Sequence, residues 1–418
     1  MQHSIPIEKR GPNGPEMARA IEACVHCGFC LPTCPTYLTM GQEIDSPRGR
    51  IFLMKEVLEG RLDPSKAEPH IDNCLGCLAC VTACPSGVKY GELVTPYRAW
   101  SEPDRRRGVI DRIRRGILLS TLPFPSRFRV SIALGRMARP IRGILPGFLS
   151  GMLEMVPADP PPPRDDLLEC YPALGARRAR VGLLAGCAQQ VLSPAINRSA
   201  IRVLNRNGIE VVVPRGQACC GALALHTGAG EAARTVARRN LLAFPDDLDA
   251  VLTTAAGCGS GIHEYGLLFK GHPEESRARS FAARTRDICV FLEEVGFIPP
   301  PDPVGENRIV AYHDACHLAH AQGVRQAPRN LLRSIPGLQV RDIPEADICC
   351  GSAGSYNIEH PATAGELGRR KARHLAGTRA DVVVTGNIGC LMQLRRHLLE
   401  SGTDLEVLHT VQLLDART

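Results

Sequence analysis

Apolar residues at helical spacing mark the segment 41–73. In its stretch RGRIFLMKEVLEGRL, Ile51, Met54, Val57 and Leu58 recur every three or four residues, which puts them on one face of a helix. We therefore expect a helix here that buries this face against a core.

The second half of the chain carries short apolar runs of a different kind. The runs RVGLLAGC, RIVAYHDAC, DAVLTTAAGC and DVVVTGNIGC are rich in aliphatic residues, and each ends at a cysteine. Such runs are typical of buried parallel strands, which here would deliver a cysteine at their carboxyl ends. Stretches of helical character, such as SPAINRSAIRVLNRNG and GELGRRKARHLAG, lie between them. This alternation of strand and helix predicts α/β structure.

The cysteines of this half repeat. Matching cysteines lie 129 to 132 residues apart, which indicates two copies of one module. Each copy contains a Cys-Cys-Gly turn, in which the glycine permits a tight backbone. Each also has one distant cysteine before this turn and one after it. The sequence thus offers two four-thiol metal sites, Cys187, Cys219, Cys220 and Cys258 in the first copy and Cys316, Cys349, Cys350 and Cys390 in the second.

Two further cysteine runs lie near the N-terminus and obey one spacing rule, C-x-x-C-x-x-C-x-x-x-C-P, starting at Cys24 and at Cys74. This spacing is typical of ligands to two 4Fe-4S clusters, in which the fourth cysteine of each run binds the other cluster. We assign Cys24, Cys27, Cys30 and Cys84 to the first cluster, and Cys34, Cys74, Cys77 and Cys80 to the second. The crossed pairing predicts neighbouring clusters, as an electron relay requires.

Zinc and disulfides are the alternative explanations of these runs. Zinc sites usually pair C-x-x-C units instead of placing three cysteines in series before a fourth that precedes proline. The N-terminal stretch MQHSIPIEKRGPNG lacks the apolar core of a signal peptide, so we expect a reducing, cytoplasmic location in which disulfides are disfavoured.

The chain of 418 residues is long enough for several domains. We predict an α+β multidomain protein, with an N-terminal α-helical ferredoxin followed by two repeated α/β modules. The long insert between the cysteine runs favours a helical ferredoxin over the compact β-rich type. Proline-rich stretches at 156–163 and 297–303 suggest the boundaries. The predicted parts are a ferredoxin domain over 1–100, a basic and proline-rich linker over 101–165, and modules over 166–300 and 301–418.

The net charge of +7 is unevenly distributed, because eleven arginines cluster between residues 105 and 142. Apolar stretches such as GILLSTLPFPSRF interrupt them. Two interpretations stay open: an interdomain helical linker with solvated charges, or a surface that meets a partner subunit or an anionic membrane. No apolar run reaches the ~18 residues of a spanning helix, so membrane contact would be peripheral or through a partner. No nucleic-acid motif accompanies the charge.

Several histidines lie near the cysteines of the modules. His313 and His317 flank Cys316, and an imidazole there could bind a metal or move a proton near a quinone. We expect His226 and His263 to be structural. His26, inside the first cysteine run, would tune its cluster because four thiolates already complete the coordination.

No dinucleotide fingerprint or Walker A lysine is found, so we expect no flavin or nicotinamide on this chain. A relay without a hydride acceptor needs a partner that oxidises the substrate, and a flavoprotein converts such a two-electron step into single electrons.

The order of two ferredoxin motifs and two Cys-Cys-Gly modules resembles the iron-sulfur subunits of glycolate oxidase, whose relatives serve glycerol-3-phosphate and lactate dehydrogenases. The resemblance covers nearly the whole chain and is carried by stretches such as ACVHCGFCLPTCPTY, NCLGCLACVTACPSGV, YHDACHLAHAQGVR and CCGSAGSYN. It implies FAD-binding partner subunits that oxidise glycolate to glyoxylate, with electrons passing through this subunit toward a respiratory-chain quinone or another acceptor.

The modules also resemble the CCG family, whose members often end in C-x-x-C. Here the last pair is interrupted, by Gly261 in the first copy and by Gln393 in the second, so each copy keeps four of the usual five cysteines. Iron-sulfur or zinc binding remains open, while the paired cluster of the heterodisulfide reductase relatives is put in doubt. Three hypotheses follow: a glycolate oxidase subunit, the same relay serving a lactate or glycerol-3-phosphate dehydrogenase, and a thiol-disulfide enzyme.

Overall fold

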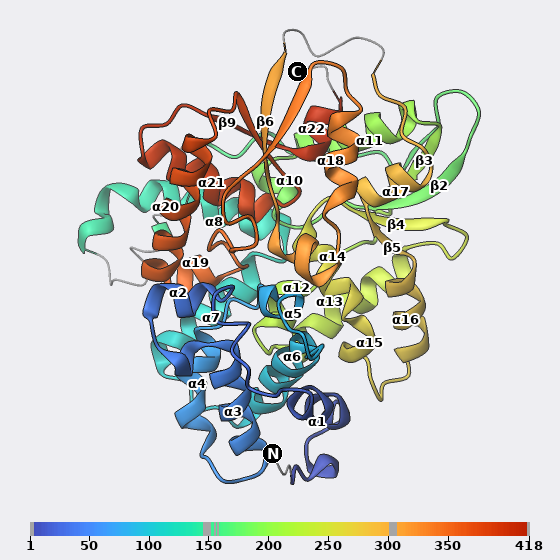
Figure 1. The fold of residues 1–418 in the computed structure, drawn as a ribbon. Coiled ribbons are helices and arrows are strands. Elements are labelled where there is room, and N and C mark those ends of the chain that lie inside the picture. Colours follow the sequence, from blue (N-terminus) through green and yellow to red (C-terminus); the bar gives the residue numbers. More distant parts are fainter. Residues whose placement is uncertain (1–3, 145–151, 154–155, 157–158, 301–306, 416–418) are drawn as a thin grey trace.

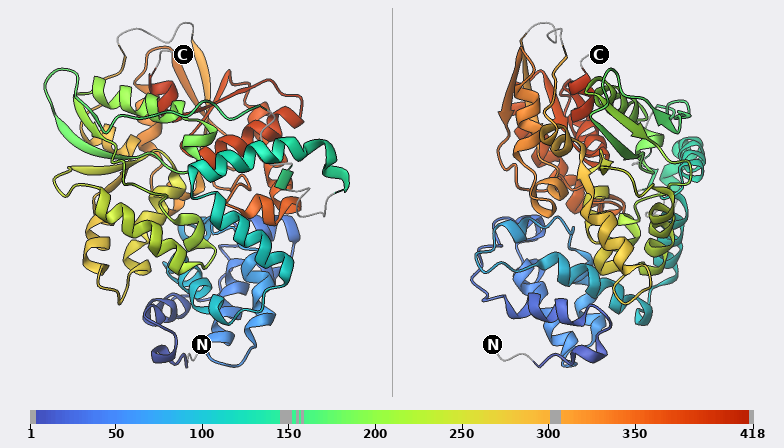
Figure 2. Two further views of the ribbon diagram at one scale, coloured as in Figure 1. Left: turned by 180° about the vertical axis from the view of Figure 1, so that it is seen from behind. Right: turned by 90° about the vertical axis from the view of Figure 1, so that its right-hand side faces the viewer.

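The computed structural model describes residues 4–144, 152–153, 156, 159–300 and 307–415. A helical N-terminal part lies at one end of the molecule, and two α/β modules lie side by side at the other (Figures 1 and 2). No helix among these residues is both long and apolar enough to cross a bilayer.

The N-terminal part is helical, as the long insert between the cysteine runs predicts. Residues 4–104 contain no strand. Ile51, Met54, Val57 and Leu58 all lie buried on α3, which begins at a proline after the Ser46 cap. The elements are η1 (Ile7–Lys9), α1 (Gly14–Glu22), α2 (Pro35–Met40), η2 (Glu43–Asp45), α3 (Pro47–Leu58), α4 (Pro64–Asp72), α5 (Ala79–Thr82), α6 (Tyr90–Ser101) and η3 (Glu102–Asp104).

The first module is built on the sheet β1-β3-β2-β4-β5, in which only β1 runs antiparallel. Its strands are β1 (Cys170–Tyr171), β2 (Ala179–Leu184), β3 (Ile209–Val212), β4 (Ala250–Thr253) and β5 (Thr285–Asp287). Its helices are α10 (Gln189–Leu192), α11 (Ala195–Arg206), α12 (Ala222–His226), α13 (Gly230–Ala243), α14 (Ala256–His263), α15 (Tyr265–Leu268), α16 (Glu275–Ala283) and α17 (Ile288–Glu294).

The second module repeats this plan in the parallel sheet β7-β6-β8-β9, which matches the order β3-β2-β4-β5. The repeat predicted from the cysteine offsets is therefore a repeat of topology. Its strands are β6 (Arg308–His313), β7 (Leu338–Asp342), β8 (Val382–Thr385) and β9 (Glu406–His409). Its helical elements are the π-helical turn η5 (His317–Ala321), α18 (Gln326–Arg333), α19 (Tyr356–Glu359), α20 (Pro361–Gly377), α21 (Ile388–Glu400) and α22 (Thr410–Asp415).

The two modules share one hydrophobic core, which contains residues from both sheets. Helix α22 packs on α11, and Arg202 of the first module forms an ion pair with Asp415 of the second. Because the modules pack on a common core, the carboxyl ends of their strands hold a fixed relation to each other.

The basic segment forms α7 (Val109–Thr121), α8 (Pro125–Ala138) and η4 (Arg139–Ile144). Several of its arginines form ion pairs within the chain: Arg105 with Asp72, Arg107 with Glu102 and Arg114 with Asp111. The proline-rich stretches at 156–163 and 297–303 fall partly outside the described residues, and the predicted domain boundaries stay predictions.

Candidate metal centres

The first cysteine site is a cavity lined by Cys24, Cys27, Cys30 and Cys84. Cys24 follows α1, and the loop after it coils back on itself because His26 and Gly28 adopt left-handed backbone angles, with φ of 54° and 87°. Cys84 reaches the same cavity from the end of α5. Cys80 also contributes to this wall, so the cavity lies beside the second site.

The second cysteine site is a separate cavity lined by Cys34, Cys74, Cys77 and Cys80. The amide of Gly76 donates to Cys74 Sγ at 3.4 Å, and the hydroxyl of Tyr90 donates to the same sulfur at 3.8 Å. Donors of this kind stabilise the negative charge of bound thiolates. The structure thus groups the eight cysteines as the crossed pairing groups them, although the ligand assignment stays a prediction.

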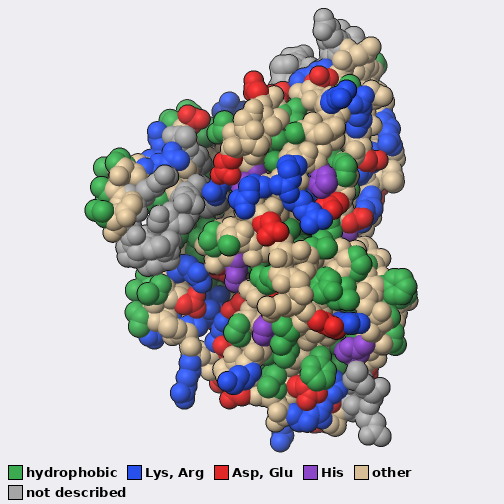
Figure 3. All heavy atoms as spheres, turned by 60° about the vertical axis from the view of Figure 1, so that its left-hand side comes forward, with side chains coloured by type: hydrophobic (Ala, Val, Ile, Leu, Met, Phe, Trp, Pro, Cys, Tyr) green, Lys and Arg blue, Asp and Glu red, His purple; other side chains and the backbone are tan. Residues whose placement is uncertain are grey.

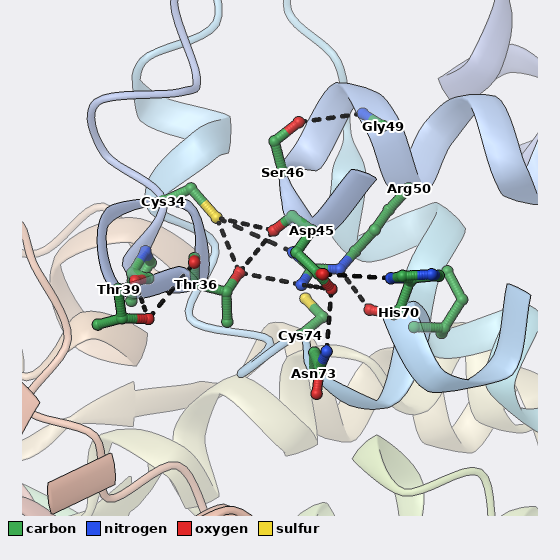
Figure 4. Close-up of polar contacts among 12 residues, drawn as sticks. Cys34, Thr36, Thr39, Asp45, Ser46, Gly49, Arg50, His70, Asn73 and Cys74 are labelled. Atoms are coloured by element: carbon green, nitrogen blue, oxygen red, sulfur yellow. Dashed lines mark hydrogen bonds and ion pairs between the residues drawn. The ribbon is translucent and has the colours of Figure 1, made fainter. Parts of the chain in front are cut away.

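A buried arginine supports the second site (Figure 4). The Arg50 side chain is 1% exposed, and its guanidinium donates to His70 O at 2.6 Å and Thr36 Oγ1 at 2.9 Å. It also approaches Cys34 Sγ at 3.9 Å and pairs with Asp45 at 3.3 Å. Asp45 in turn accepts from Asn73, while His70 Nδ1 lies 3.2 Å from it.

The charge of Arg50 acts on the neighbouring sulfurs. Burial acts to raise the pKa of Cys74, but the guanidinium groups of Arg50 and Arg98 outweigh it and hold this pKa below its usual range. Sequence reasoning missed Arg50. A signal was present, because Arg50 precedes Met54 by one helical turn and so lies on the apolar face of α3.

The two sites differ in exposure. Cys27 is exposed at the surface, flanked by Val25 and Phe29, whose side chains are 67% and 66% exposed. Cys34 and Cys77 of the second site are buried. The first site is therefore open to the surface at Cys27, while Cys34 and Cys77 of the second lie in the interior of the molecule.

The first module gathers its four cysteines at the carboxyl ends of its strands. Cys187 follows β2 and Cys258 lies in the first turn of α14, after β4. These neighbouring strands connect in opposite directions, which makes this edge the switch point where open α/β sheets bind ligands. The Cys219 and Cys187 sulfurs lie 3.3 Å apart.

The second module repeats the arrangement with Cys316, Cys349, Cys350 and Cys390, and the Cys316 and Cys349 sulfurs lie 3.7 Å apart. The sequence runs predict strands that end at Cys258 and Cys390, whereas β4 and β8 end at Thr253 and Thr385. A turn and the start of a helix intervene, so each sulfur comes from the first turn of the following helix.

The glycine of each Cys-Cys-Gly turn is required by its conformation. Gly221 and Gly351 have φ of 82° and 89°, and a Cβ on Gly351 would lie 2.6 Å from Ala364 O. Each glycine amide donates at 3.4 Å to the first cysteine sulfur of its own turn. In each module, the turn therefore places the glycine amide against the sulfur of the first cysteine.

Both module sites open onto one cavity of about 900 Å³. Seven of their eight cysteines line it, namely Cys187, Cys219, Cys220, Cys258, Cys316, Cys349 and Cys390. Further walls come from α4, α6, α7, α8, α19 and the loop around Leu75 of the second ferredoxin site. The predicted linker is thus a wall of this cavity.

The chain matches two domain families. Residues 20–88 match the 4Fe-4S dicluster domain, and residues 181–263 and 310–395 each match the Cysteine-rich domain (CCG). It is 36% identical over 417 residues to the glycolate oxidase iron-sulfur subunit of Escherichia coli, covering 95% of this chain and 96% of that protein. It is 35% identical over 412 residues to the probable glycolate oxidase iron-sulfur subunit of Bacillus subtilis, covering 94% and 92%.

The chain belongs to the glycolate oxidase iron-sulfur subunit family. A more distant relative, a subunit of the fumarate reductase (CoM/CoB) of Methanothermobacter marburgensis, is 27% identical over 98% of this chain and 75% of that protein. The dicluster match spans all eight N-terminal cysteines, and their grouping into two cavities fits two iron-sulfur clusters.

His226 and His317 lie where the helical part meets the modules. His317 Nε2 lies 3.0 Å from the carbonyl oxygen of Gly76, between two cysteines of the second ferredoxin site. Its ring packs edge-on against His226, which in turn lies 3.2 Å from Glu264 Oε1. Burial lowers the pKa of His317 to about 4, so its imidazole is neutral near pH 7. His263 is exposed at the end of α14.

Proposed function

We propose that this chain is the electron-transfer subunit of a glycolate oxidase. FAD-binding partner subunits would oxidise glycolate to glyoxylate, and this chain would deliver the electrons toward a respiratory-chain quinone. When bound, the clusters supply one-electron carriers between two-electron donor and acceptor.

The order of the cysteine sites supports this proposal best. The first ferredoxin site is open to the surface at Cys27 and shares a wall with the second. At the second site, Cys77 packs in one cluster with Cys349 of the second module, and Cys316 packs against that cluster. The sites thus form a series from the surface to the cavity of about 900 Å³.

We place the flavoprotein on the surface around Cys27. Val25 and Phe29 expose apolar side chains there, which is typical of the centre of a docking interface. The Phe29→Glu variant should weaken binding of the flavoprotein subunits about tenfold or more, because a charge replaces an apolar side chain that the interface would bury. We would measure complex formation and glycolate-driven reduction of the iron-sulfur absorption.

Leu399→Glu is the matched control, because Leu399 is 80% exposed on α21 of the second module, far along the chain from this surface. Equal weakening by both variants, or none by Phe29→Glu, would remove the docking surface from the proposal.

We place the cytoplasmic leaflet of the cell membrane against α8. Val130, Leu134, Met137 and Ile141 follow one face of this helix and of η4 and are 51–79% exposed. Basic and hydrophobic side chains lie together on the projection at the left of Figure 3. Such a face can lie on anionic lipid. Leu134 and Ile141 also line the large cavity, which gives a lipophilic quinone a route from the membrane to the module cysteines.

A double variant tests this route. We expect Val130→Glu with Met137→Glu to reduce binding to anionic vesicles, since each exposed apolar side chain contributes on the order of 1–2 kcal/mol when it enters the interface. The rate at which a long-chain quinone in the vesicles is reduced should fall together with vesicle binding. A water-soluble acceptor should be reduced at an unchanged rate.

Leu242→Glu with Leu399→Glu is the control, because both residues are highly exposed elsewhere on the surface. Vesicle binding that stays unchanged in the α8 variant would rule out the membrane surface.

The substrate is tested with the native complex. We would purify the chain anaerobically with its flavoprotein, add glycolate, D-lactate, L-lactate or glycerol-3-phosphate separately, and follow bleaching of the iron-sulfur absorption. We expect glycolate to bleach the iron-sulfur absorption faster than the other three donors. Faster bleaching by another donor would reassign the substrate. Disulfide turnover without bleaching by any donor would favour thiol-disulfide chemistry at the modules.

A further inference from the structure

We propose that His313 is a metal ligand of the second module, so that the two modules hold chemically different metal sites. The imidazole would join the thiolates of the Cys-Cys-Gly site and complete a donor set that the first module cannot form. The inference does not depend on which substrate reduces the protein.

The donor atoms of His313, Cys350 and Cys390 lie within 4.8 Å of one another, and all three residues are buried. His313 is the last residue of the central strand β6, so the strand brings its ring to the carboxyl edge of the sheet. Cys350 comes from the loop after β7, and Cys390 from the first turn of α21. Three separate elements thus converge on one point.

The buried imidazole of His313 interacts with a cysteine of the site itself. His313 is 1% exposed, and its ring nitrogens have no hydrogen-bond partner among the residues that the structure describes apart from the Cys350 thiol. A buried polar group left unpaired costs about 1–3 kcal/mol. Other buried histidines of the module do have such partners: His320 lies near Thr82 Oγ1 and His409 near Thr254 O. A metal ion would satisfy one nitrogen of His313.

Among the described residues of the first module, no histidine stands at the matching position. Leu184 ends β2 three residues before Cys187, as His313 ends β6 three residues before Cys316. Leu184 packs in the apolar core with Cys219 and Cys220. The first site therefore has four thiols and no imidazole, while the second has four thiols and one.

The residues that replace the fifth cysteine in each module are consistent with this difference between the two sites. A Cβ at Gly261 would lie 2.5 Å from the Cβ of Ala222, so the first module has no room for any side chain at that position. In the second module, Gln393 is turned to the backbone and donates to Ala364 O at 3.1 Å. The fifth donor of the second module thus comes from the strand and not from the helix.

Thiolates combined with an imidazole select thiophilic metals, and both Zn²⁺ and the iron of a cluster accept this set. The test must distinguish these two metals and separate them from the all-cysteine ferredoxin sites. We would produce the full chain anaerobically with ¹⁵N-imidazole-labelled histidine. Metal and sulfide content would be measured together with X-ray absorption at the zinc edge and nitrogen hyperfine coupling in the reduced protein.

We expect one histidine nitrogen bound to zinc or coupled to iron in the native chain, and we expect this signal to be absent from His313→Ala. His313→Cys should retain the metal with an all-sulfur environment, which shows that the module still folds. Leu184→Ala, the matched position in the first module, should change neither the nitrogen signal nor the metal content.

Three outcomes would overturn the proposal. These are a native chain without any histidine nitrogen on a metal, a nitrogen signal that survives in both His313 variants, and a metal content that the two 4Fe-4S clusters account for completely. Glycolate-driven bleaching is not used as a readout, so a wrong substrate assignment would leave these outcomes unaffected.

Discussion

Replacing Cys84 by serine is expected to damage the same cluster as replacing Cys27, although the two residues belong to different cysteine runs. Both line the first cavity, and the crossed assignment makes both ligands of one cluster. Removing a residue that hydrogen-bonds to a metal ligand already costs about 10–100-fold in metal affinity or activity. Removing a ligand itself should cost at least as much. Electron delivery from the flavoprotein should therefore fall at least that far, while reduction of the flavin itself stays intact.

We would measure the iron content of each variant and record electron paramagnetic resonance spectra of the reduced protein. The two clusters are expected to give separable signals in these spectra. Cys34→Ser and Cys77→Ser should form the reciprocal pair and affect the other signal. Cys170→Ser is the control, because this exposed cysteine lies in β1, outside all four sites. The crossed assignment would be wrong if Cys84→Ser altered the same signal as Cys77→Ser. Unchanged iron content in Cys27→Ser would contradict the ligand assignment as a whole.

Replacing Arg50 by glutamine is expected to lower the reduction potential of the second ferredoxin site by roughly 50–100 mV. A unit charge about 5 Å away contributes about 3 kcal/mol at an effective dielectric constant of about 20, which is on the order of 100 mV for one electron. The nearby carboxylate of Asp45 offsets part of this effect. Since reduction adds negative charge, losing the guanidinium disfavours the reduced state.

A redox titration followed by electron paramagnetic resonance measures both clusters in one sample. Arg50→Lys retains the charge and should shift the potential much less, which separates electrostatics from loss of the hydrogen bonds to His70 and Thr36. Asp45→Asn removes the opposing charge and should shift the potential upward. Equal shifts of both clusters in Arg50→Gln would contradict a local role, because the contacts of Arg50 are with the second site.

The sequence by itself located the cysteines of four candidate sites and predicted two 4Fe-4S clusters among them. Ligands of a 4Fe-4S cluster occur at short fixed spacing, so the two runs from Cys24 and Cys74 are readable without any tertiary structure. The module repeat is readable for the same reason, because matching offsets and short strand runs are local patterns. The helix α3 and the strands β2, β4, β6 and β8 follow directly from these patterns.

Only the tertiary structure decided which groups surround these sulfurs. Arg50 meets Cys34 only when α3 packs against the loops, and no spacing rule encodes that contact. His313 and His317 look equivalent around Cys316 in the sequence. In the structure, His317 turns to the Gly76 carbonyl of the ferredoxin part, whereas His313 lies buried beside the thiols of Cys350 and Cys390.

The large cavity was likewise invisible in the sequence. Its walls come from both modules, the helical part and the basic segment, which the sequence assigns only as a linker or an external surface. Local sequence patterns predict the position of a ligand residue on its own helix or strand, because side-chain direction follows the period of that element. The neighbours of that residue depend on long-range packing, which no local pattern records.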